Sequence, residues 1–154
     1  MMGRSSLSHL FAPVFLSILC SLAISPASAE ITHSFLGVGK ANQAVIVAED
    51  GTVEWKFEKP ASDGWVLPNG NVLLAVYPCK EYPKGGVAEI ERASNKTVFS
   101  YQGQQNEIST VQLLPDGSFL IAELGPKPRA RTINRKGKIL HDMPFSCQKQ
   151  NIHM

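Results

Sequence analysis

The stretch LPNG at residues 67–70, followed by VLLA at 72–75, returns as LPDG at residues 114–117, followed by FLIA at 119–122. In each copy a Pro-x-Gly turn separates two short apolar segments, which is the pattern of a β-hairpin. The two hairpins therefore indicate an internal repeat of one structural unit, with a period close to the spacing of about 47 positions between them.

A second motif repeats in step with the first. It reads GTVEWKF at residues 51–57, NKTVFSY at 95–101 and GKILHDM at 137–143. A period of about 40–50 residues built from short strands and tight turns is typical of the blades of a β-propeller. We therefore predict an all-β fold of propeller blades with WD40-like architecture. Each blade has about 44 residues, and the chain holds two full blades and part of a third.

Alternating apolar residues and turn residues locate the expected strands, at 44–48, 52–57, 64–67, 71–77, 86–91, 97–101, 109–114, 118–123, 130–133 and 139–143. Residues 60–64 are expected to form a loop. Two apolar sets are expected to face a neighbouring blade: Val53, Trp55 and Phe57 in one unit, and Val98, Phe99 and Tyr101 in the next. Trp55, Phe57, Phe99 and Tyr101 are the predicted structural core of the blades, because a lone four-stranded sheet leaves an apolar face open.

The first 29 residues have the layout of a secretory signal peptide. Arg4 is the only charged residue before Glu30, an apolar run spans residues 10–24, and PASA at 26–29 offers an Ala-x-Ala cleavage site. The alternative is a membrane anchor, but the run is short for a span and serines interrupt it. We predict a cleaved signal peptide at 1–29, a partial propeller domain at 30–154, and a secreted or bacterial periplasmic location.

The composition limits the classes of partner that the mature chain can bind. The whole sequence has 15 basic and 13 acidic residues, and cleavage removes Arg4 alone. A nearly neutral chain gives no electrostatic basis for nucleic-acid binding, which needs a strongly basic surface. No other apolar stretch is long enough to cross a membrane.

The length of the predicted domain is short for a propeller. Residues 30–154 hold fewer than three blades of about 44 residues, whereas closed propellers have about four or more. Either the chain is the N-terminal part of a longer product, or several copies complete a ring, or the sheets form a smaller fold. The first alternative is favoured, and further blades or self-association are expected to close the ring.

DGTVEW at residues 50–55, the paired LPxG turns and the export signal together resemble the PQQ-like repeat β-propellers. Over about residues 35–154 the chain looks most like the uncharacterised bacterial secreted members, and more distantly like the propeller of arylsulfotransferases. The resemblance implies a binding or scaffold module with no defined catalytic residue. The alternative is the N-terminal part of a propeller transferase or hydrolase whose active site lies mostly in absent blades.

The resemblance does not extend to bound quinone. Quinone-dependent relatives carry the repeat Ala-x-Asp-x-x-Thr-Gly-Lys-x-x-Trp, whereas AEDGTVEW at residues 48–55 is shorter and lacks the Thr-Gly pair. The vicinal cysteine pair of the alcohol dehydrogenases is missing as well. No cofactor is therefore expected.

The resemblance also implies a candidate ligand site. In relatives with the LPxG turn, the inner strand often begins with a His or a small polar residue that points toward the central channel. This position falls on Ser62 and Ser109, and one further repeat reaches His153. We hypothesise that these residues, with Asp63 and Thr110 beside them, line one mouth of the channel and bind a small molecule, a carbohydrate or a protein. The alternative is that they are polar strand starts that face water.

The sequence does not indicate a metal site. His141 and Asp142 are adjacent on an expected strand, so their side chains point to opposite faces, and no close His/Cys spacing supports a closed shell around a metal. His141 is instead expected to fill the aromatic position of its blade.

Three further features have two interpretations each. The basic stretch 127–138 is either a surface for anionic partners or a solvated hairpin. Trp65 either stacks on a sugar or, as favoured, belongs to the blade core. In an oxidising compartment Cys79 and Cys147 either form a disulfide or stay unpaired.

Overall fold

The computed structural model describes residues 33–41 and 43–146. The predictions for residues 1–29, for Cys147 and for His153 lie outside these residues. The described part consists of β-strands and connections, without a helix. It accordingly includes no helix long and apolar enough to cross a membrane.

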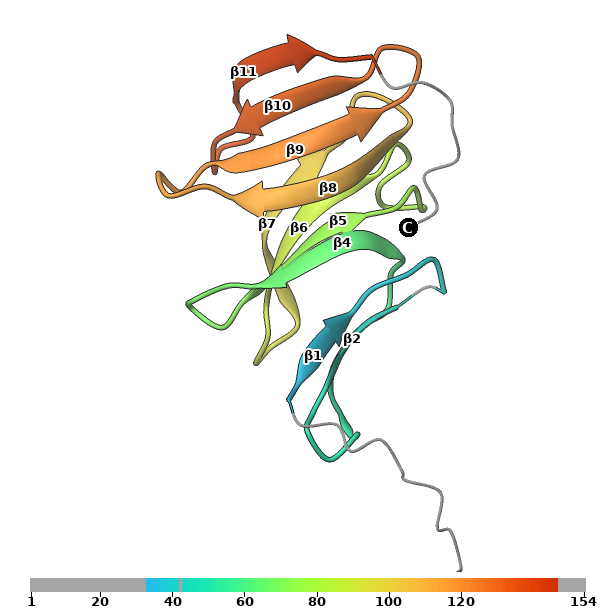
Figure 1. The fold of residues 1–154 in the computed structure, drawn as a ribbon, viewed down its shortest axis with the longest axis vertical. Coiled ribbons are helices and arrows are strands. Elements are labelled where there is room, and N and C mark those ends of the chain that lie inside the picture. Colours follow the sequence, from blue (N-terminus) through green and yellow to red (C-terminus); the bar gives the residue numbers. More distant parts are fainter. Residues whose placement is uncertain (1–32, 42, 147–154) are drawn as a thin grey trace, which may run out of the picture. The chain divides into compact units, whose positions relative to one another are not determined.

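The strands form three antiparallel sheets in which each strand pairs with its neighbours in sequence (Figure 1). The first sheet contains β1 (Phe35–Gly37), β2 (Ala44–Val47) and β3 (Val53–Phe57). The second contains β4 (Ala61–Val66), β5 (Val72–Val76), β6 (Gly86–Glu91) and β7 (Lys96–Gln102). The third contains β8 (Glu107–Leu113), β9 (Phe119–Leu124), β10 (Arg129–Ile133) and β11 (Ile139–Pro144). The prediction of an all-β chain of propeller-type blades is confirmed.

The LPxG motifs form the turns that connect β4 to β5 and β8 to β9. In each turn the glycine N–H donates to the carbonyl of the motif's leucine, over 2.8 Å at Gly70 and 2.9 Å at Gly117. Both glycines have a left-handed backbone, with φ of 84° and 82°. Because side chains disfavour this conformation, the glycine is the residue that the hairpin requires.

The sheets bury their apolar side chains in two separate clusters. One joins the first and second sheets and includes Trp55 and Phe57. The other joins the second and third sheets and includes Phe99 and Tyr101. The second sheet is covered on both faces, and every residue of β5 is therefore buried. Such a strand reads as a continuous apolar run, VLLAV, instead of an alternating one.

The expectation that Val53 and Val98 face the next blade together with Trp55 and Phe99 is wrong. The pairing of β2 with β3 shifts by one residue after Ile46, so Val53 pairs with Val47 and Trp55 with Ile46. The side chains of Ile46 and Val47 are neighbours on β2 and point to opposite faces of the sheet. Because of the β-bulge, their partners Trp55 and Val53 therefore lie on opposite faces as well. A similar shift on β7 leaves Val98 opposite no residue, with 49% of its surface exposed.

The strand limits agree with the expected ones to within two residues except at the start of β4, and β1 was not among the expected strands. Residues 60–64 were expected to form a loop, but β4 begins at Ala61 and pairs with β5 from there. A shift in this pairing between Ala61 and Asp63 accommodates Ser62, which explains why simple alternation does not reveal the strand start.

Candidate functional site

The first strands of the second and third sheets, β4 and β8, lie side by side, and side chains connect them. Ser62 donates its hydroxyl hydrogen bond to the carbonyl of Ile108, over 2.9 Å, and lies 3.2 Å from the carbonyl of Ala75 in its own sheet. Ser109 makes the equivalent bond within the third sheet, to the carbonyl of Ala122 over 3.3 Å. The two serines thus occupy equivalent places in their sheets, as their spacing indicates.

Asp63 and Thr110 meet directly. The Oδ2 atom of Asp63 accepts hydrogen bonds from the hydroxyl of Thr110 and from the backbone N–H of Val111, the latter over 3.1 Å. Its Oδ1 atom accepts from the N–H of Gly64 over 2.8 Å. The structure therefore brings Ser62, Asp63 and Thr110 together at the junction of two sheets, while Ser109 bonds within its own sheet. These contacts are structural bonds, and ligand binding by the four residues and His153 stays a prediction.

We expect Asp63→Ala to lower the free energy of unfolding by about 1–3 kcal/mol, because the N–H of Val111 and the hydroxyl of Thr110 lose their acceptor. Urea unfolding followed by circular dichroism measures this change. Asp50→Ala is the matched control. Asp50 also accepts from a hydroxyl and an N–H, those of Thr52, but in an exposed turn. Equal stability of Asp63→Ala and the unaltered protein would contradict a stabilising role for these bonds.

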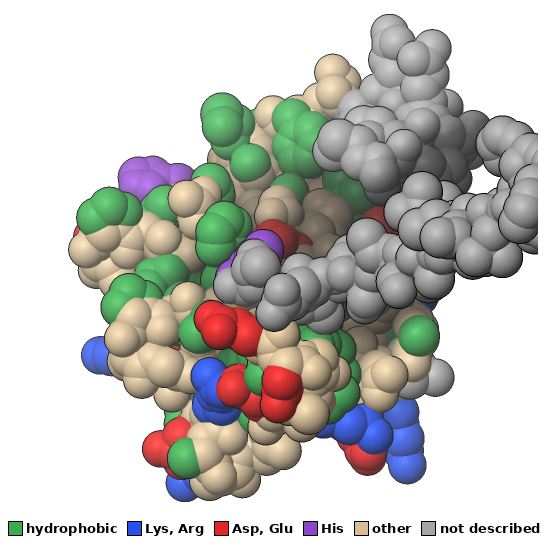
Figure 2. Space-filling model, turned by 60° about the horizontal axis from the view of Figure 1, so that its bottom comes forward, with side chains coloured by type: hydrophobic (Ala, Val, Ile, Leu, Met, Phe, Trp, Pro, Cys, Tyr) green, Lys and Arg blue, Asp and Glu red, His purple; other side chains and the backbone are tan. Residues whose placement is uncertain are grey.

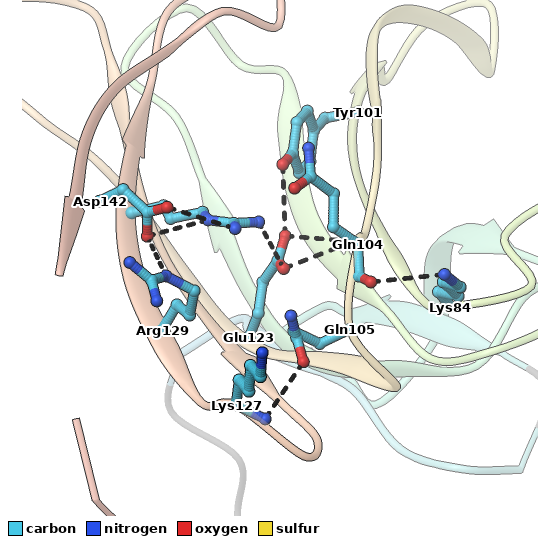
Figure 3. A network of polar contacts seen from close by, with 9 residues as sticks. Lys84, Tyr101, Gln104, Gln105, Glu123, Lys127, Arg129 and Asp142 are labelled. Atoms are coloured by element: carbon cyan, nitrogen blue, oxygen red, sulfur yellow. Dashed lines mark hydrogen bonds and ion pairs between the residues drawn. The ribbon is translucent and has the colours of Figure 1, made fainter. Parts of the chain in front are cut away.

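A network of charged side chains crosses the second cluster (Figure 3). At its centre the fully buried carboxylate of Glu123 on β9 accepts from Arg131 Nη1 over 2.8 Å. The hydroxyl of Tyr101, on β7 of the second sheet, donates to the other oxygen of Glu123 over 3.3 Å. Arg131 in turn contacts Asp142 on β11, which also pairs with Arg129. Both oxygens of Glu123 are therefore engaged.

The network shifts the pKa values of Tyr101 and Asp142. Burial, with the neighbouring charge of Glu123, raises the pKa of Tyr101 to about 12. Hydrogen bonds from Arg129 and Arg131 lower the pKa of Asp142 below its usual value. Tyr101 is therefore neutral and Asp142 ionised at neutral pH. Neutral Tyr101 can donate to Glu123, and ionised Asp142 can accept from Arg129 and Arg131, as a structural network requires.

A second buried carboxylate joins the same two sheets. Glu89 on β6 accepts from the amide of Asn71 over 2.7 Å and from Arg135 Nη1 over 2.6 Å. The guanidinium of Arg135 also lies over the ring of Phe119, 5.0 Å from its centre. Glu89 and Glu123 were not predicted from the sequence. Each is a glutamate flanked by apolar residues within a strand, and that pattern could have indicated a buried ion pair.

These ion pairs change the interpretation of the basic stretch 127–138. Arg129, Arg131 and Arg135 all pair with carboxylates, so half of its six cations are neutralised. On the part of the face in Figure 2 that grey atoms do not cover, basic and acidic side chains lie near one another. Half of the cations in this stretch therefore serve in ion pairs within the protein instead of forming a surface for anionic partners.

An apolar groove lies where β4 and β8 end. Its volume is about 470 Å³, and it is lined by equivalent residues of the two LPxG hairpins: Trp65, Val66, Leu67, Pro68, Gln112, Leu113, Leu114 and Pro115. Trp65 is 49% exposed, so the expectation that it belongs to the blade core is wrong. Its indole N–H donates to the carbonyl of Val111 over 2.6 Å, which fixes the orientation of the ring. The groove is lined without a charged side chain.

The described residues contain no group of three or more His, Cys, Asp or Glu side chains that could hold a metal ion. Cys79 is half-buried near the carboxylate of Glu81, with 3.6 Å between the sulfur and Oε2. Its pairing with Cys147 involves a residue outside the described part.

Comparisons with known proteins show the fold. No protein-family model matches the chain, and no curated protein matches it in sequence. Its structure is similar to that of a protein of unknown function from Bacteroides caccae, with a TM-score of 0.60 and 21% identity over 75% of this chain and 41% of that one. It is similar to the WD40 β-propeller domain of Doa1, with a TM-score of 0.60 and 13% identity over 74% of this chain and 37% of that one.

The chain therefore spans about two fifths of the length of these structures. At such identities the similarity concerns the fold alone. Together with the three sheets and their two interfaces, it shows that the chain has a β-propeller-like architecture.

Proposed function

We propose that this chain is an exported PQQ-like β-propeller segment that acts as a binding or scaffold module. Further blades or further copies complete its ring. The groove beside Trp65 is the observation that carries the proposal. It combines a half-exposed aromatic ring of fixed orientation with a concave apolar lining, and recognition sites in proteins commonly combine these features.

The lining of the groove favours a neutral ligand. An acidic or basic ligand would enter an apolar groove without a charged partner, which costs free energy. A sugar ring presents C–H groups that stack on an aromatic face, and the amide of Gln112 offers both a donor and an acceptor for hydroxyl groups. We therefore propose a neutral carbohydrate as the ligand, with the Trp65 ring as the stacking surface. The groove is distinct from the Ser62, Asp63, Ser109, Thr110 and His153 set, which we retain as a separate proposed mouth of the channel.

The test uses the fluorescence of the protein. The chain has two tryptophans, and Trp55 is buried while Trp65 is half exposed. Titration with neutral oligosaccharides is expected to shift the emission of Trp65. Because the variants lack the fluorescent Trp65 ring, their binding is measured by titration calorimetry. Trp65→Ala should abolish binding and change the free energy of unfolding by no more than about 1 kcal/mol, since the lost groups are a half-exposed ring and one hydrogen bond.

Trp65→Phe is the matched control. It keeps an aromatic face but loses the donor to Val111, so we expect weaker but measurable binding. A charged oligosaccharide that binds as tightly as a neutral one would contradict the proposal. So would a ligand whose affinity is equal for the unaltered protein and Trp65→Ala. Binding of a peptide alone, with no carbohydrate bound, would assign the groove to a protein partner.

A further inference from the structure

The three sheets are joined by one type of interface, which occurs twice. The last two strands of every sheet share the same one-residue shift in pairing, after Ile46, Glu89 and Thr132. This places Trp55, Phe99 and His141 at equivalent positions, opposite those three residues. We call the face that carries them the leading face of each sheet. Trp55 of the first sheet and Phe99 of the second lie in the clusters shared with the next sheet.

The opposite side of each sheet is its receiving face. On the second sheet this face includes Val72, and on the third sheet it includes Phe119, at the equivalent position. Both side chains are fully buried. The contact is direct in the second interface, where the rings of Phe99 and Phe119 lie with their centres 4.8 Å apart.

The leading face of the third sheet is open in the described part of the chain. The pairing registers align Leu120, Thr132 and His141 on it, and also Ala122, Ala130 and Met143. Met143 is 63% exposed, whereas Tyr101, its equivalent on the second sheet, is 7% exposed. These six side chains carry no carboxylate, ammonium or guanidinium group.

The receiving face of the first sheet is likewise not covered by another sheet in the described part of the chain. Phe35, Val47 and Val53 align across it. Phe35 is 43% exposed and Val53 60% exposed. The equivalents of Phe35 on the other two sheets are Val72 and Phe119, which are buried. The described part of one chain therefore presents both halves of an interface that it already uses twice.

We propose that the leading face of the third sheet binds the receiving face of the first sheet of a second copy of this chain. The contact repeats the register of the two internal interfaces, so that His141 of one copy lies against Phe35 of the other. Such a head-to-tail contact is heterologous and can close into a ring. Two copies bring together six sheets, within the range of about four to eight blades found in propellers. The proposal does not depend on carbohydrate binding by the Trp65 groove.

The molecular mass in solution tests the interface. Light scattering and sedimentation of the purified chain are expected to give the mass of two copies. Met143→Glu and Phe35→Glu should each weaken association by about 100-fold or more, because a carboxylate would be buried without a partner. Val98→Glu is the matched control, since Val98 is 49% exposed but lies at a bulge outside both faces. The mass of a single copy at every concentration would overturn the proposal, as would equal dissociation by Val98→Glu.

A cross-linking experiment tests the direction of the contact without relying on the glutamate variants. In chains whose native cysteines are replaced by serine, His141→Cys and Phe35→Cys are prepared separately and treated with a short bismaleimide. Cross-linked pairs are expected when the two variants are mixed and not with either alone. A cross-link of His141→Cys to itself would show like faces in contact and would overturn the head-to-tail arrangement.

Discussion

Replacing Arg131 by alanine is expected to lower the free energy of unfolding by about 3–5 kcal/mol, because it leaves a buried carboxylate without its cation. Glu123, the partner of Arg131, has no exposed surface, and Arg131 itself is 5% exposed. The hydroxyl of Tyr101 would remain as a neutral donor to Glu123. A neutral donor cannot replace the charge of the guanidinium, so the variant must either bury an ionised carboxylate or protonate it.

Urea unfolding at neutral pH, followed by circular dichroism, measures the expected loss. Stability equal to that of the unaltered protein would show that Arg131 is not needed to compensate the buried carboxylate.

A double variant separates the cost of an unpaired charge from the value of the pair. Glu123→Leu combined with Arg131→Met removes both charges while keeping much of the side-chain volume, and it should cost much less than Arg131→Ala alone. Arg92→Ala provides the surface control, because the Arg92–Glu54 pair is exposed and should contribute no more than about 1 kcal/mol. A double variant as unstable as Arg131→Ala would contradict the explanation by an unpaired carboxylate.

The sequence predicts most of the fold because repeated turns and apolar strands are local signals. The LPxG motifs specify a left-handed glycine and hence the β4–β5 and β8–β9 hairpins. β-Bulges are harder to predict from the sequence, since the register shifts after Ile46 and Glu89 depend on pairing between strands. Val53 and Val98 were for this reason assigned to the wrong face.

The candidate site is less predictable because it depends on contacts between sheets. Asp63 and Thr110 were both identified, but the repeat assigns them to the same kind of position without showing that they bond to each other. Trp65 was expected in the core because it belongs to an inner strand. Its exposure follows from a place at the end of β4, where a groove between two hairpins begins. Glu89 and Glu123 required knowledge of the guanidinium groups across the interface.

Replacing Trp55 by alanine is expected to lower the free energy of unfolding by about 3–5 kcal/mol, because a large buried ring would leave a cavity between the first and second sheets. Trp55 is 5% exposed and its ring is parallel to that of Phe57, with 6.2 Å between their centres. The controls separate the volume of the ring from its polar group.

The indole N–H of Trp55 has no hydrogen-bond partner among the described residues. Trp55→Phe therefore loses no hydrogen bond and should cost no more than about 1.5 kcal/mol. Val98→Ala, at an exposed position, should stay within about 0.5 kcal/mol of the unaltered protein. Urea unfolding ranks the three variants. A cost below about 1 kcal/mol for Trp55→Ala would show that the packing of these two sheets does not stabilise the chain, because burial of a large aromatic side chain otherwise contributes more than this.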